Sequence, residues 1–579
     1  MKLTEMTIDY FRSIKNCHVY FDEINAVVGE NNAGKTALLR ALNSVFNWKY
    51  EEPYFLNNAH QYSPRTKTKI SLVFDALPDK EIYSNKQVDG KLTLVFTYAY
   101  SNTTRKKTLG YISQQQEIIS VDDSFIGCLK QDIDYVYIPA GRGGKELTWG
   151  NDSIFSRVLS AYAKASMQNR DTLSIQVSNV SDSFKNKIFA RLENELQTAS
   201  MLEASENYKL GFTDGIDYTI FLNHVGLNIN ESGRILPIGE YGSGIKSITV
   251  IALYRALAKL QGVNVILGIE EPETNLHPHA QKKLIASLKD GRQDQEIQAI
   301  FATHSTVIVD ELSHEDIILA RRVQDTRRGF YTEYTQLSHS FWTDYNLDEY
   351  KHNNFFRYRN SEFFFSRFVV VVESITDAQV VNELIKDEIG ERIYHISILN
   401  LDGVKNLKYP YFLLKSLGIP FAMVVDRDFL SQYSNGSLDA SRNAVTFLPS
   451  YTAIPNSRNA VIKDIWNSSA LLSALEDHMK KSYSKLFTYC QAKNMYVMQY
   501  CLEMDLVAAD KARATYCQLY GITNDSTSYK KLLIDRKDAI KSPDKILQIV
   551  SSLQPMDYPF SFKKIRRALV DEINAKVHI

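Results

Sequence analysis

The feature that most constrains this chain is a glycine-rich stretch at residues 29–36, which reads Gly-Glu-Asn-Asn-Ala-Gly-Lys-Thr. It follows a short apolar run at 24–28 and precedes an amphipathic run that begins at Ala37. A glycine turn between a strand and a helix directs backbone N–H groups and the positive helix end at an anion. In this pattern the lysine reaches the outer phosphates and the threonine ligates Mg²⁺. The sequence therefore predicts a nucleoside triphosphate site, held by Gly29, Asn31, Asn32, Gly34, Lys35 and Thr36.

Length and composition narrow the class of protein. A chain of 579 residues is too long for one core and indicates roughly three or four domains. The formal net charge is zero, so any surface for nucleic acid must be a local patch. No apolar run approaches the roughly 18 residues that span a bilayer, and the first residues lack an apolar signal region. The five cysteines form no C-x-x-C pair, so we expect a cytoplasmic protein with reduced thiols and no membrane association.

Further polar residues follow apolar runs in the first half. The run 263–269 ends at Glu270 and Glu271, and the run 299–303 ends at His304. Carboxylates at a buried strand end can hold the water shell of Mg²⁺ and polarise an attacking water, and a histidine there can contact a γ-phosphate. A Gly242-Ser243-Gly244 turn precedes an apolar helix at 248–260 and could form an anion-binding nest, although by itself a plain helix start is the better interpretation.

Together these residues resemble the ATP-binding-cassette ATPases of the SMC, RecF and OLD groups. The resemblance assigns residues 29–36 to the Walker A motif, 242–244 to the signature region, 270–273 to Walker B and His304 to the switch histidine. The resemblance implies that the site binds ATP with Mg²⁺, that Glu270 lies at the metal and that Glu271 is the catalytic carboxylate. It also implies an oligomer, because the signature of one subunit closes over ATP held by another. The signature is not L-S-G-G-Q, and Asp75 is the candidate for the missing Q-loop glutamine.

In the second half, carboxylates again follow apolar runs. Glu373 follows the run 368–372, and Asp426 and Asp428 follow the run 419–425. Strands alternating with helices predict a parallel sheet whose carboxyl ends gather these acids at one edge. Such acids repel one another unless a cation neutralises them, and oxygen ligands favour Mg²⁺ or Mn²⁺. Two such ions can support phosphodiester cleavage. The alternative is three unrelated acids at strand ends.

This arrangement resembles a Toprim domain, and an ATPase followed by Toprim resembles the OLD-family nucleases, including Gabija-type anti-phage effectors. The resemblance implies that Glu373 is an acid/base or metal ligand and that Asp426 and Asp428 are metal ligands for Mg²⁺, with Mn²⁺ or Ca²⁺ as alternatives. It adds Asp377, Glu503 and Asp505 as candidate ligands, and Lys537 or Lys541 as a catalytic lysine, of which we favour Lys541. For Glu503, Asp505, Lys537 and Lys541 a solvated helix face is an equally good interpretation. Ten basic residues toward the C-terminus are candidate phosphate contacts, namely Lys530, Lys531, Arg536, Lys537, Lys541, Lys545, Lys563, Lys564, Arg566 and Arg567.

The expected fold class is α/β, with an N-terminal ATPase of the SMC and RecF type, an inserted helical dimerisation element, a Toprim domain and a mostly helical C-terminal region. The expected segments are the ATPase at 1–150 and 211–330, the helical insertion at 151–210, a linker at 331–362, the Toprim core at 363–450 and the helical region at 451–579.

The leading hypothesis is an ATP-gated, metal-dependent DNA endonuclease or nickase that acts in anti-phage defence, the last point resting on the resemblance alone. Expected partners are DNA, further copies of the chain as a dimer or tetramer through the ATPase domain, and a regulatory protein or a retron RNA–DNA hybrid. The alternative is a RecF-like repair ATPase that uses Toprim to bind DNA. Topoisomerase and primase are disfavoured, because the former needs additional domains and the cysteine spacing offers no zinc site for the latter.

Overall fold

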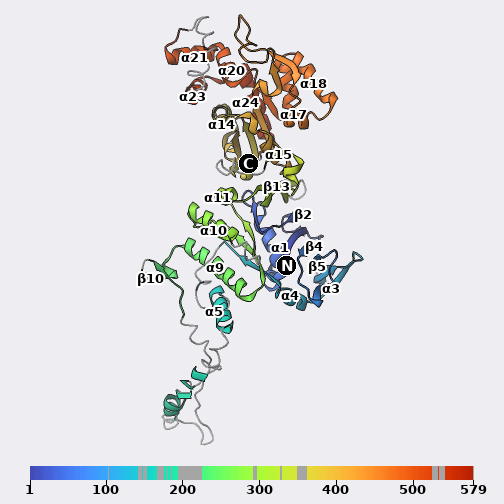
Figure 1. Cartoon of the computed structure of the whole chain (residues 1–579), viewed down its shortest axis with the longest axis vertical. Helices are drawn as coiled ribbons and strands as arrows, with labels where there is room; N and C mark the ends of the chain where they lie inside the picture. The colour runs from blue at the N-terminus through green and yellow to red at the C-terminus, as the bar shows by residue number, and fades with distance from the viewer. Residues whose placement is uncertain are drawn as a thin grey trace. The chain divides into compact units, whose positions relative to one another are not determined.

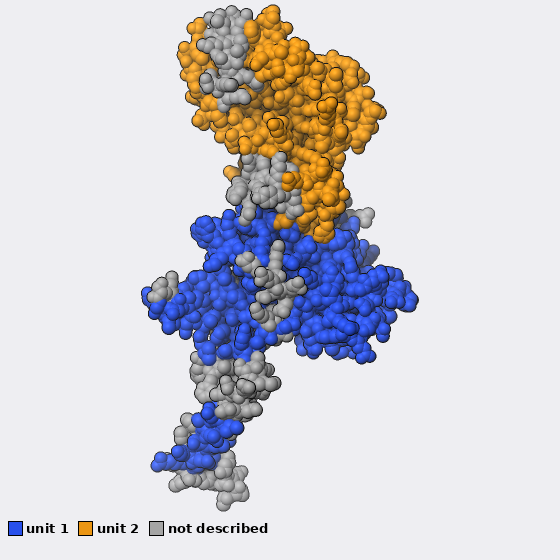
Figure 2. Space-filling model, viewed as in Figure 1, with its two compact units in different colours: residues 1–312, 316–334 blue, residues 313–315, 335–579 orange. Residues whose placement is uncertain are grey.

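The computed structural model divides the chain into two compact units, coloured separately in Figure 2. Unit 1 comprises residues 1–312 and 316–334, and unit 2 comprises residues 313–315 and 335–579. The structure describes residues 1–101, 104–140, 147, 153–165, 175–177, 179–180, 182–183, 185–193, 225–231, 233–290, 297–325, 329–348, 361–523, 532–533 and 542–577.

One large sheet organises unit 1. In its described part the strand order is β7-β6-β5-β4-β1-β2-β14-β13-β3-β12-β11-β8. Its first part is an antiparallel layer, in which Ile70 faces Phe96 and Ile8 faces Ile70, as expected from the alternating sequence at 70–74 and 92–98. The strands of this layer are β1 (Lys2–Phe11), β2 (Ile14–Tyr20), β4 (Thr68–Asp75), β5 (Leu92–Ser101), β6 (Thr104–Ile112) and β7 (Ile118–Val121).

The other part of the sheet is parallel and carries the glycine-rich loop. Its strands are β3 (Ile24–Val28), β8 (Ile133–Ile138), β11 (Asn264–Glu270), β12 (Ile297–Ala302) and β13 (Ile317–Asp325), and β14 (Gly329–Gln336) lies beside β13. All residues of β3 are buried, as is typical of a strand covered on both faces. Since β3, β11 and β12 run in the same direction, their carboxyl ends meet at one edge. This edge positions the nucleotide pocket.

Helices cover this sheet. Helix α1 (Lys35–Phe46) starts directly at the loop and buries most of its residues in the core, where Leu38, Leu42 and Phe46 lie beneath the sheet. Figure 1 shows α1 beside the strands of unit 1 and α9 and α10 on the green part of the chain. The remaining helices of unit 1 are α2 (Trp48–Leu56), α3 (Glu81–Ser84), α4 (Asp123–Leu129), α5 (Ile154–Ala165), α9 (Ser243–Gln261), α10 (Pro278–Asp290) and α11 (Thr306–Asp310).

The helical insertion expected at 151–210 is described only in part. Helix α5 packs against α9, and a π-helical turn spans Lys185–Phe189. A short hairpin follows, formed by β9 (Asn228–Glu231) and β10 (Arg234–Pro237). Residues 194–224 lie outside the described part of the chain, so the dimerisation role of this insertion stays a prediction.

Unit 2 is built on a second sheet, whose described strands have the order β16-β15-β17-β20 and are all parallel. They are β15 (Phe368–Val372), β16 (Ile396–Asn400), β17 (Phe421–Val425) and β20 (Met495–Val497). The apolar runs that suggested buried strands at 368–372 and 421–425 are indeed buried, and the expected parallel sheet is confirmed. A small hairpin, β18 (Ser431–Tyr433) and β19 (Tyr451–Pro455), follows the third of these strands in sequence.

Helices dominate the rest of unit 2, as the sequence pattern predicted. Helices α14, α20, α21, α23 and α24 share one apolar cluster with β15 and β17. The helices are α12 (Phe341–Asp344), α14 (Ile375–Ile389), α15 (Lys408–Ser416), α16 (Arg427–Leu430), α17 (Ala460–Ile465), α18 (Ser469–Lys480), α19 (Tyr483–Gln491), α20 (Leu502–Ala508), α21 (Asp510–Tyr520), α23 (Pro543–Ser552) and α24 (Phe560–Lys576). No described helix is both long and apolar enough to cross a membrane.

The prediction of a linker over 331–362 is wrong for its first part. Residues 331–336 belong to β14, and Tyr334 is buried in the core of unit 1. Phe341 and Trp342 are buried in α12, where the Trp342 ring stacks on Tyr409 at a centroid distance of 5.3 Å. The aromatic side chains of Tyr334, Phe341 and Trp342 are buried in a core, so this aromatic-rich part of the segment is not a linker. Residues 349–360 lie outside the described part.

Candidate functional site

The glycine-rich loop has the backbone geometry of a phosphate cradle. Gly29 and Gly34 have φ values of 143° and 103°. Residues with a Cβ atom rarely adopt such positive φ values, whereas glycine adopts them readily. A Cβ on Gly29 would lie 2.1 Å from the Ala320 carbonyl oxygen, and one on Gly34 would lie 2.5 Å from Thr332 Oγ1. Both glycines are therefore required by strands that pack directly behind the loop. The loop keeps its N–H groups at the start of α1, where the helix dipole favours an anion.

Lys35 lies inside this loop. Its Nζ donates to the carbonyl oxygens of Gly29 at 3.0 Å and Glu30 at 2.7 Å, and the residue is only 7% exposed. Burial lowers the pKa of Lys35 to about 8, although Glu273, Glu271 and Glu30 act in the opposite direction. A buried ammonium held by neutral carbonyl groups is suited to receive a phosphate, which would restore the favourable environment of its charge.

The carboxyl ends of β11 and β12 complete the site. Glu270 ends β11, and Glu271 follows with a φ of 41° and donates its N–H to Ala302 O at 2.8 Å. Glu273 accepts bonds from the His304 N–H at 2.6 Å and from Thr303 Oγ1 at 2.7 Å. Glu273 thus fixes the turn that carries His304 after β12. The pKa of His304 is lowered, mainly by burial and then by Lys35, which favours the neutral imidazole.

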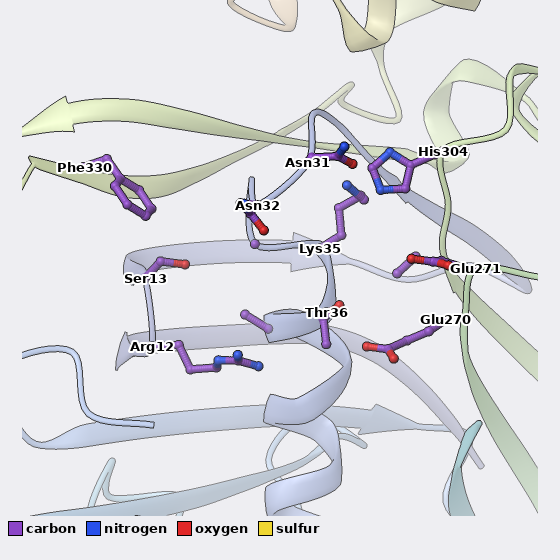
Figure 3. A pocket seen from close by; sticks show the side chains of 13 residues that line it. Arg12, Ser13, Asn31, Asn32, Lys35, Thr36, Glu270, Glu271, His304 and Phe330 are labelled. Carbon is purple, nitrogen blue, oxygen red and sulfur yellow. The ribbon is translucent and has the colours of Figure 1, made fainter. Parts of the chain in front are cut away.

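A cavity of about 520 Å³ joins these residues, and Figure 3 shows their arrangement. The predicted residues that line it are Asn31, Asn32, Gly34, Lys35, Thr36, Glu270, Glu271 and His304. Thr36 and Glu270 lie near each other below Lys35, where a Mg²⁺ ion bound with a nucleotide would need oxygen ligands. The donor set, the cradle and the charge of Lys35 all fit a nucleotide with Mg²⁺.

Sequence reasoning missed three lining residues, Arg12, Ser13 and Phe330. Arg12 has a φ of 52° in the turn between β1 and β2, and burial lowers its pKa. Within the described residues, its buried Nη1 has no hydrogen-bond partner, so an anion could satisfy it. The signal was available in part, because a basic and a hydroxyl residue follow an N-terminal strand. Their position beside the loop depends on the order of strands in the sheet.

Two other expectations for unit 1 need correction. Asp75 was the candidate for the Q-loop, but it pairs with Lys2, at the opposite end of β1 from Arg12 and the cavity. Gly242, Ser243 and Gly244 lie at the start of α9, five residues earlier than the helix predicted from 248, and do not line the cavity of their own chain. Gly244 is needed for packing, because a Cβ there would lie 2.4 Å from Asn275 O. Their contact with nucleotide in a partner subunit stays a prediction.

In unit 2, acids collect at the carboxyl edge of the parallel sheet. Glu373 follows β15, and Asp426 and Asp428 flank the start of α16 after β17. The pKa of Glu373 is raised to about 7, by burial first and then by the charges of Asp428, Asp377 and Glu503. Burial and the same group of acids raise the pKa of Asp426 well above its ordinary value. The structure therefore brings Glu503, from α20, into electrostatic contact with the three acids found from strand ends.

The two remaining acids have structural partners. Asp377 forms a capping box with Ser374, in which its Oδ2 accepts bonds from the Ser374 N–H at 2.9 Å and Oγ at 2.6 Å, and only this oxygen takes part. Asp505 accepts the N–H groups of Gln499 at 2.8 Å and Tyr500 at 2.9 Å, one on each oxygen. Each oxygen of Asp505 thus helps to hold the loop before α20, and its role as a metal ligand stays a prediction.

The acidic edge has the oxygen donors that a divalent cation needs, but its described carboxylates do not converge on one point. The oxygen donors and the raised pKa values indicate a place where negative charge lacks a counter-charge. Nevertheless, no three His, Cys, Asp or Glu side chains in the described part of the chain converge as a ready metal site. A cation would have to draw these carboxylates together, since ligand distances are about 2.0–2.6 Å. Lys537 and the favoured Lys541 lie outside the described residues.

Tyr433 and Tyr451 border this acidic edge. The Tyr433 O–H donates to Asp428 Oδ2 at 3.2 Å, and the two tyrosine rings stack with centroids 5.1 Å apart.

Of the basic residues expected to contact phosphate, Arg566 is engaged with Glu388 and the Leu384 carbonyl, while Arg567 is 87% exposed in its side chain. The sequence pattern could not separate these cases, because it does not show which helix face is packed.

Comparisons with known proteins identify one domain family in each half of the chain. Residues 1–137 and 127–309 match the family described as AAA ATPase domain, which therefore covers more than half of the chain. Residues 364–428 match the family described as overcoming lysogenization defect protein-like, TOPRIM domain, a segment that contains Glu373, Asp377, Asp426 and Asp428. The chain belongs to the AAA ATPase domain family, and its second half contains a segment similar to the OLD-type TOPRIM domain.

Curated relatives of this chain carry nuclease names. It is 23% identical over 457 residues to OLD nuclease of Thermus scotoductus, covering 74% of this chain and 82% of the relative. It is 23% identical to Old nuclease of Escherichia phage P2, covering 74% and 78%. It is 25% identical to Endonuclease GajA of Bacillus cereus, over 47% of this chain and 44% of that protein. The chain thus combines an ATPase domain with a Toprim nuclease domain.

Solved structures include the head domain of Smc bound to the C-winged helix domain of ScpA. It matches at 14% identity and a TM-score of 0.40, covering 59% of this chain and 99% of that one.

Proposed function

We propose that this protein is an ATP-gated, divalent-metal-dependent DNA endonuclease of the OLD family. The observation that carries the proposal is the acidic edge of unit 2. There, burial and the charges of neighbouring carboxylates, including those of Asp428 and Glu503, raise the pKa values of Glu373 and Asp426. A surface that only bound DNA would not concentrate negative charge beside a phosphate backbone. Divalent cations bound there would activate water and stabilise the leaving oxygen of a phosphodiester.

The residues of this edge divide the work by their surroundings. Glu373, with a pKa of about 7, can both hold and release a proton near neutral pH. Asp426 and Asp428 offer oxygens from the end of the neighbouring strand, and Asp377 can add Oδ1 from the first turn of α14. The bond from Tyr433 fixes the orientation of Asp428.

Chain connectivity supports gating by ATP. The Tyr334 O–H, on β14, donates to Gly34 O in the phosphate loop at 2.8 Å. The next residue, Thr335, belongs to unit 2, where its Oγ1 donates to Leu417 O at 2.9 Å at the end of α15. A nucleotide that shifts Gly34 therefore acts on a strand that enters the nuclease unit one residue later. Two adjacent residues anchored in different units are suited to couple them.

Within unit 1 the proposed cycle uses Lys35 and Thr36 to bind ATP with Mg²⁺, Glu271 to polarise the attacking water and His304 to contact the γ-phosphate. The signature residues 242–244 would close over ATP held by another copy, as a dimer or tetramer. The proposed role in anti-phage defence, and a regulatory protein or RNA–DNA hybrid as partner, rest on the family resemblance. The names OLD nuclease and Endonuclease GajA support the nuclease part.

Nicking of supercoiled plasmid tests the proposal, with Mg²⁺ or Mn²⁺ and with or without ATP or a non-hydrolysable analogue. We expect wild type to cut the plasmid and Glu373→Gln to lose cutting. Lys35→Ala should lose the response to ATP. The cutting rate that remains in Lys35→Ala, compared with wild type, shows whether ATP activates or restrains the nuclease. Tyr334→Phe should bind ATP normally yet show a weaker ATP response. Tyr331→Phe, three residues away on the same strand and therefore on its opposite face, is the matched control.

Two outcomes would contradict the proposal. Cutting that survives Glu373→Gln and Asp426→Asn would remove the acidic edge from the chemistry. DNA binding without cutting under any metal or nucleotide condition would favour the RecF-like ATPase, in which unit 2 only binds DNA. Plaque counts on bacteria expressing wild type or Glu373→Gln test the defence role separately.

A further inference from the structure

The nucleotide cavity has an end that the phosphate chemistry does not use. Figure 3 shows His304 and Glu271 on one side of Lys35 and Phe330 on the other, at the far end of the cavity. Since Lys35, Glu271 and His304 mark the γ-phosphate end, a bound nucleotide must extend its sugar and base in the opposite direction. That direction leads past Ser13 to Phe330.

Strand β14 fixes the position of Phe330 along this path. Thr332 packs against Gly34, its Oγ1 bonds to Ser13 Oγ at 2.7 Å, and Tyr334 donates to Gly34 O. Because side chains alternate along a strand, Phe330, Thr332 and Tyr334 share one face, which is the face toward the phosphate loop. Phe330 therefore lies roughly 7 Å further along the strand than Thr332, beyond the phosphates.

The Phe330 ring already has a partner on one face. The Arg322 guanidinium, on the neighbouring strand β13, lies 3.8 Å from the ring centroid. Phe330 is half-buried and lines the cavity, so the ring is accessible to a ligand there. A half-buried aromatic ring that lines the cavity and has a guanidinium on one face is suited to stack on a planar base.

We infer that Phe330 stacks on the nucleobase of the bound nucleotide, with Arg322 on the opposite face of the ring. This inference rests on the proposed nucleotide site and adds its base-binding end. A stacked base is recognised by its flat surface, without hydrogen bonds to its edge, so the site should accept adenine and guanine with similar affinity. The inference also places the base beside β14, the strand that carries Tyr334, and we propose that the bond from Tyr334 to Gly34 takes part in gating.

Calorimetric titration of the full chain with Mg²⁺ and ATP, GTP or inorganic tripolyphosphate tests the inference. Phe330→Ala should weaken ATP and GTP binding by roughly 5- to 100-fold, the range expected for one base–aromatic stack. Its affinity for tripolyphosphate, which has no base, should be unchanged. Phe330→Trp should keep ATP binding, and its added indole fluorescence should be quenched by ATP but not by tripolyphosphate. Tyr20→Ala, an exposed tyrosine at the far end of β2, is the control.

The outcomes separate the two proposals. If wild type binds ATP and Phe330→Ala binds it equally well, the stacking inference is overturned and the nucleotide site stands. If Phe330→Ala weakens tripolyphosphate as much as ATP, the residue supports the loop and does not bind the base, which also overturns the inference. If wild type binds neither ATP nor tripolyphosphate, both the nucleotide site and the inference fail.

Discussion

The two sites of this chain solve opposite electrostatic problems. The nucleotide pocket buries Lys35 against the carbonyl oxygens of Gly29 and Glu30, and the pKa of Lys35 is lowered to about 8. The acidic edge of unit 2 gathers carboxylates, and the pKa of Glu373 is raised to about 7. One site is prepared for an anion and the other for cations. The pocket is largely rigid backbone, whereas the edge depends on side chains that a metal must draw together.

The largest expected effect separates the two sites by function. Glu373→Gln or Asp426→Asn should lower DNA cleavage by about 100-fold or more, because metal-bound chemistry contributes several kcal/mol to the transition state. Nucleotide affinity should be unchanged, since neither residue lines the cavity of unit 1. Single-turnover cleavage and calorimetry on the same samples provide the measurement. Glu391→Gln, an exposed acid of unit 2, is the control. A parallel loss of nucleotide affinity would break the comparison.

The second prediction concerns the cost of bare negative charge. A raised folded-state pKa means that the fold favours protonated Glu373, so this contribution to stability is lost as the pH rises through about 7. Above pH 7 without metal, Glu373→Gln should therefore be more stable than wild type by roughly 1–3 kcal/mol, given about 1.4 kcal/mol per pKa unit. The difference should shrink toward pH 4, and Mg²⁺ should stabilise wild type more. Urea unfolding in EDTA or Mg²⁺ measures this; equal stabilities in EDTA would contradict it.

Two histidines ten residues apart extend the comparison. His304 lies at the pocket, whereas His314 is 4% exposed and bonds to Tyr409 in an aromatic cluster of unit 2. Burial lowers the pKa of His314 to about 3. The folded state therefore resists protonation, and stability should be complete above pH 6.5 and fall as the pH decreases, by about 2 kcal/mol at pH 5.

His314→Leu should flatten this decrease even if it lowers stability overall, so the slope of unfolding free energy against pH is the quantity to measure. The exposed His279→Gln should leave the slope as in wild type. An unchanged slope in His314→Leu would show that other groups cause the acid sensitivity.

The smallest expected effect tests how the acidic edge is ordered. Tyr433→Phe removes the bond to Asp428 and should lower cleavage by about 3- to 10-fold, as for a single hydrogen bond to a charged group. High Mg²⁺ should restore most of the rate, because the loss lies in positioning a ligand. Tyr394→Phe, at an 85% exposed tyrosine, is the control. A rate that is low at every Mg²⁺ concentration would argue for a different role of the ring.

Local patterns predicted the parts of both sites that one segment of chain contains. The loop 29–36 and the acids after β15 and β17 could be found because a strand, a turn and a helix start follow one another in sequence. Glu503 and Asp505 show the limit of this reasoning. They lie two residues apart on α20, yet Glu503 acts on the acidic edge and Asp505 holds the N–H groups of its own loop.

The sequence by itself determined the phosphate loop, the acidic strand ends and the order of two α/β units, because hydrophobic period and glycine positions act over a few residues. The tertiary structure decided which distant residues join them. Arg12 and Phe330 reach the cavity only because β1, β2 and β14 neighbour the parallel strands in the sheet. Strand order results from packing across the whole unit, so no local pattern records it. The tertiary structure also made residues 331–336 a strand, which leads from the phosphate loop into the nuclease unit.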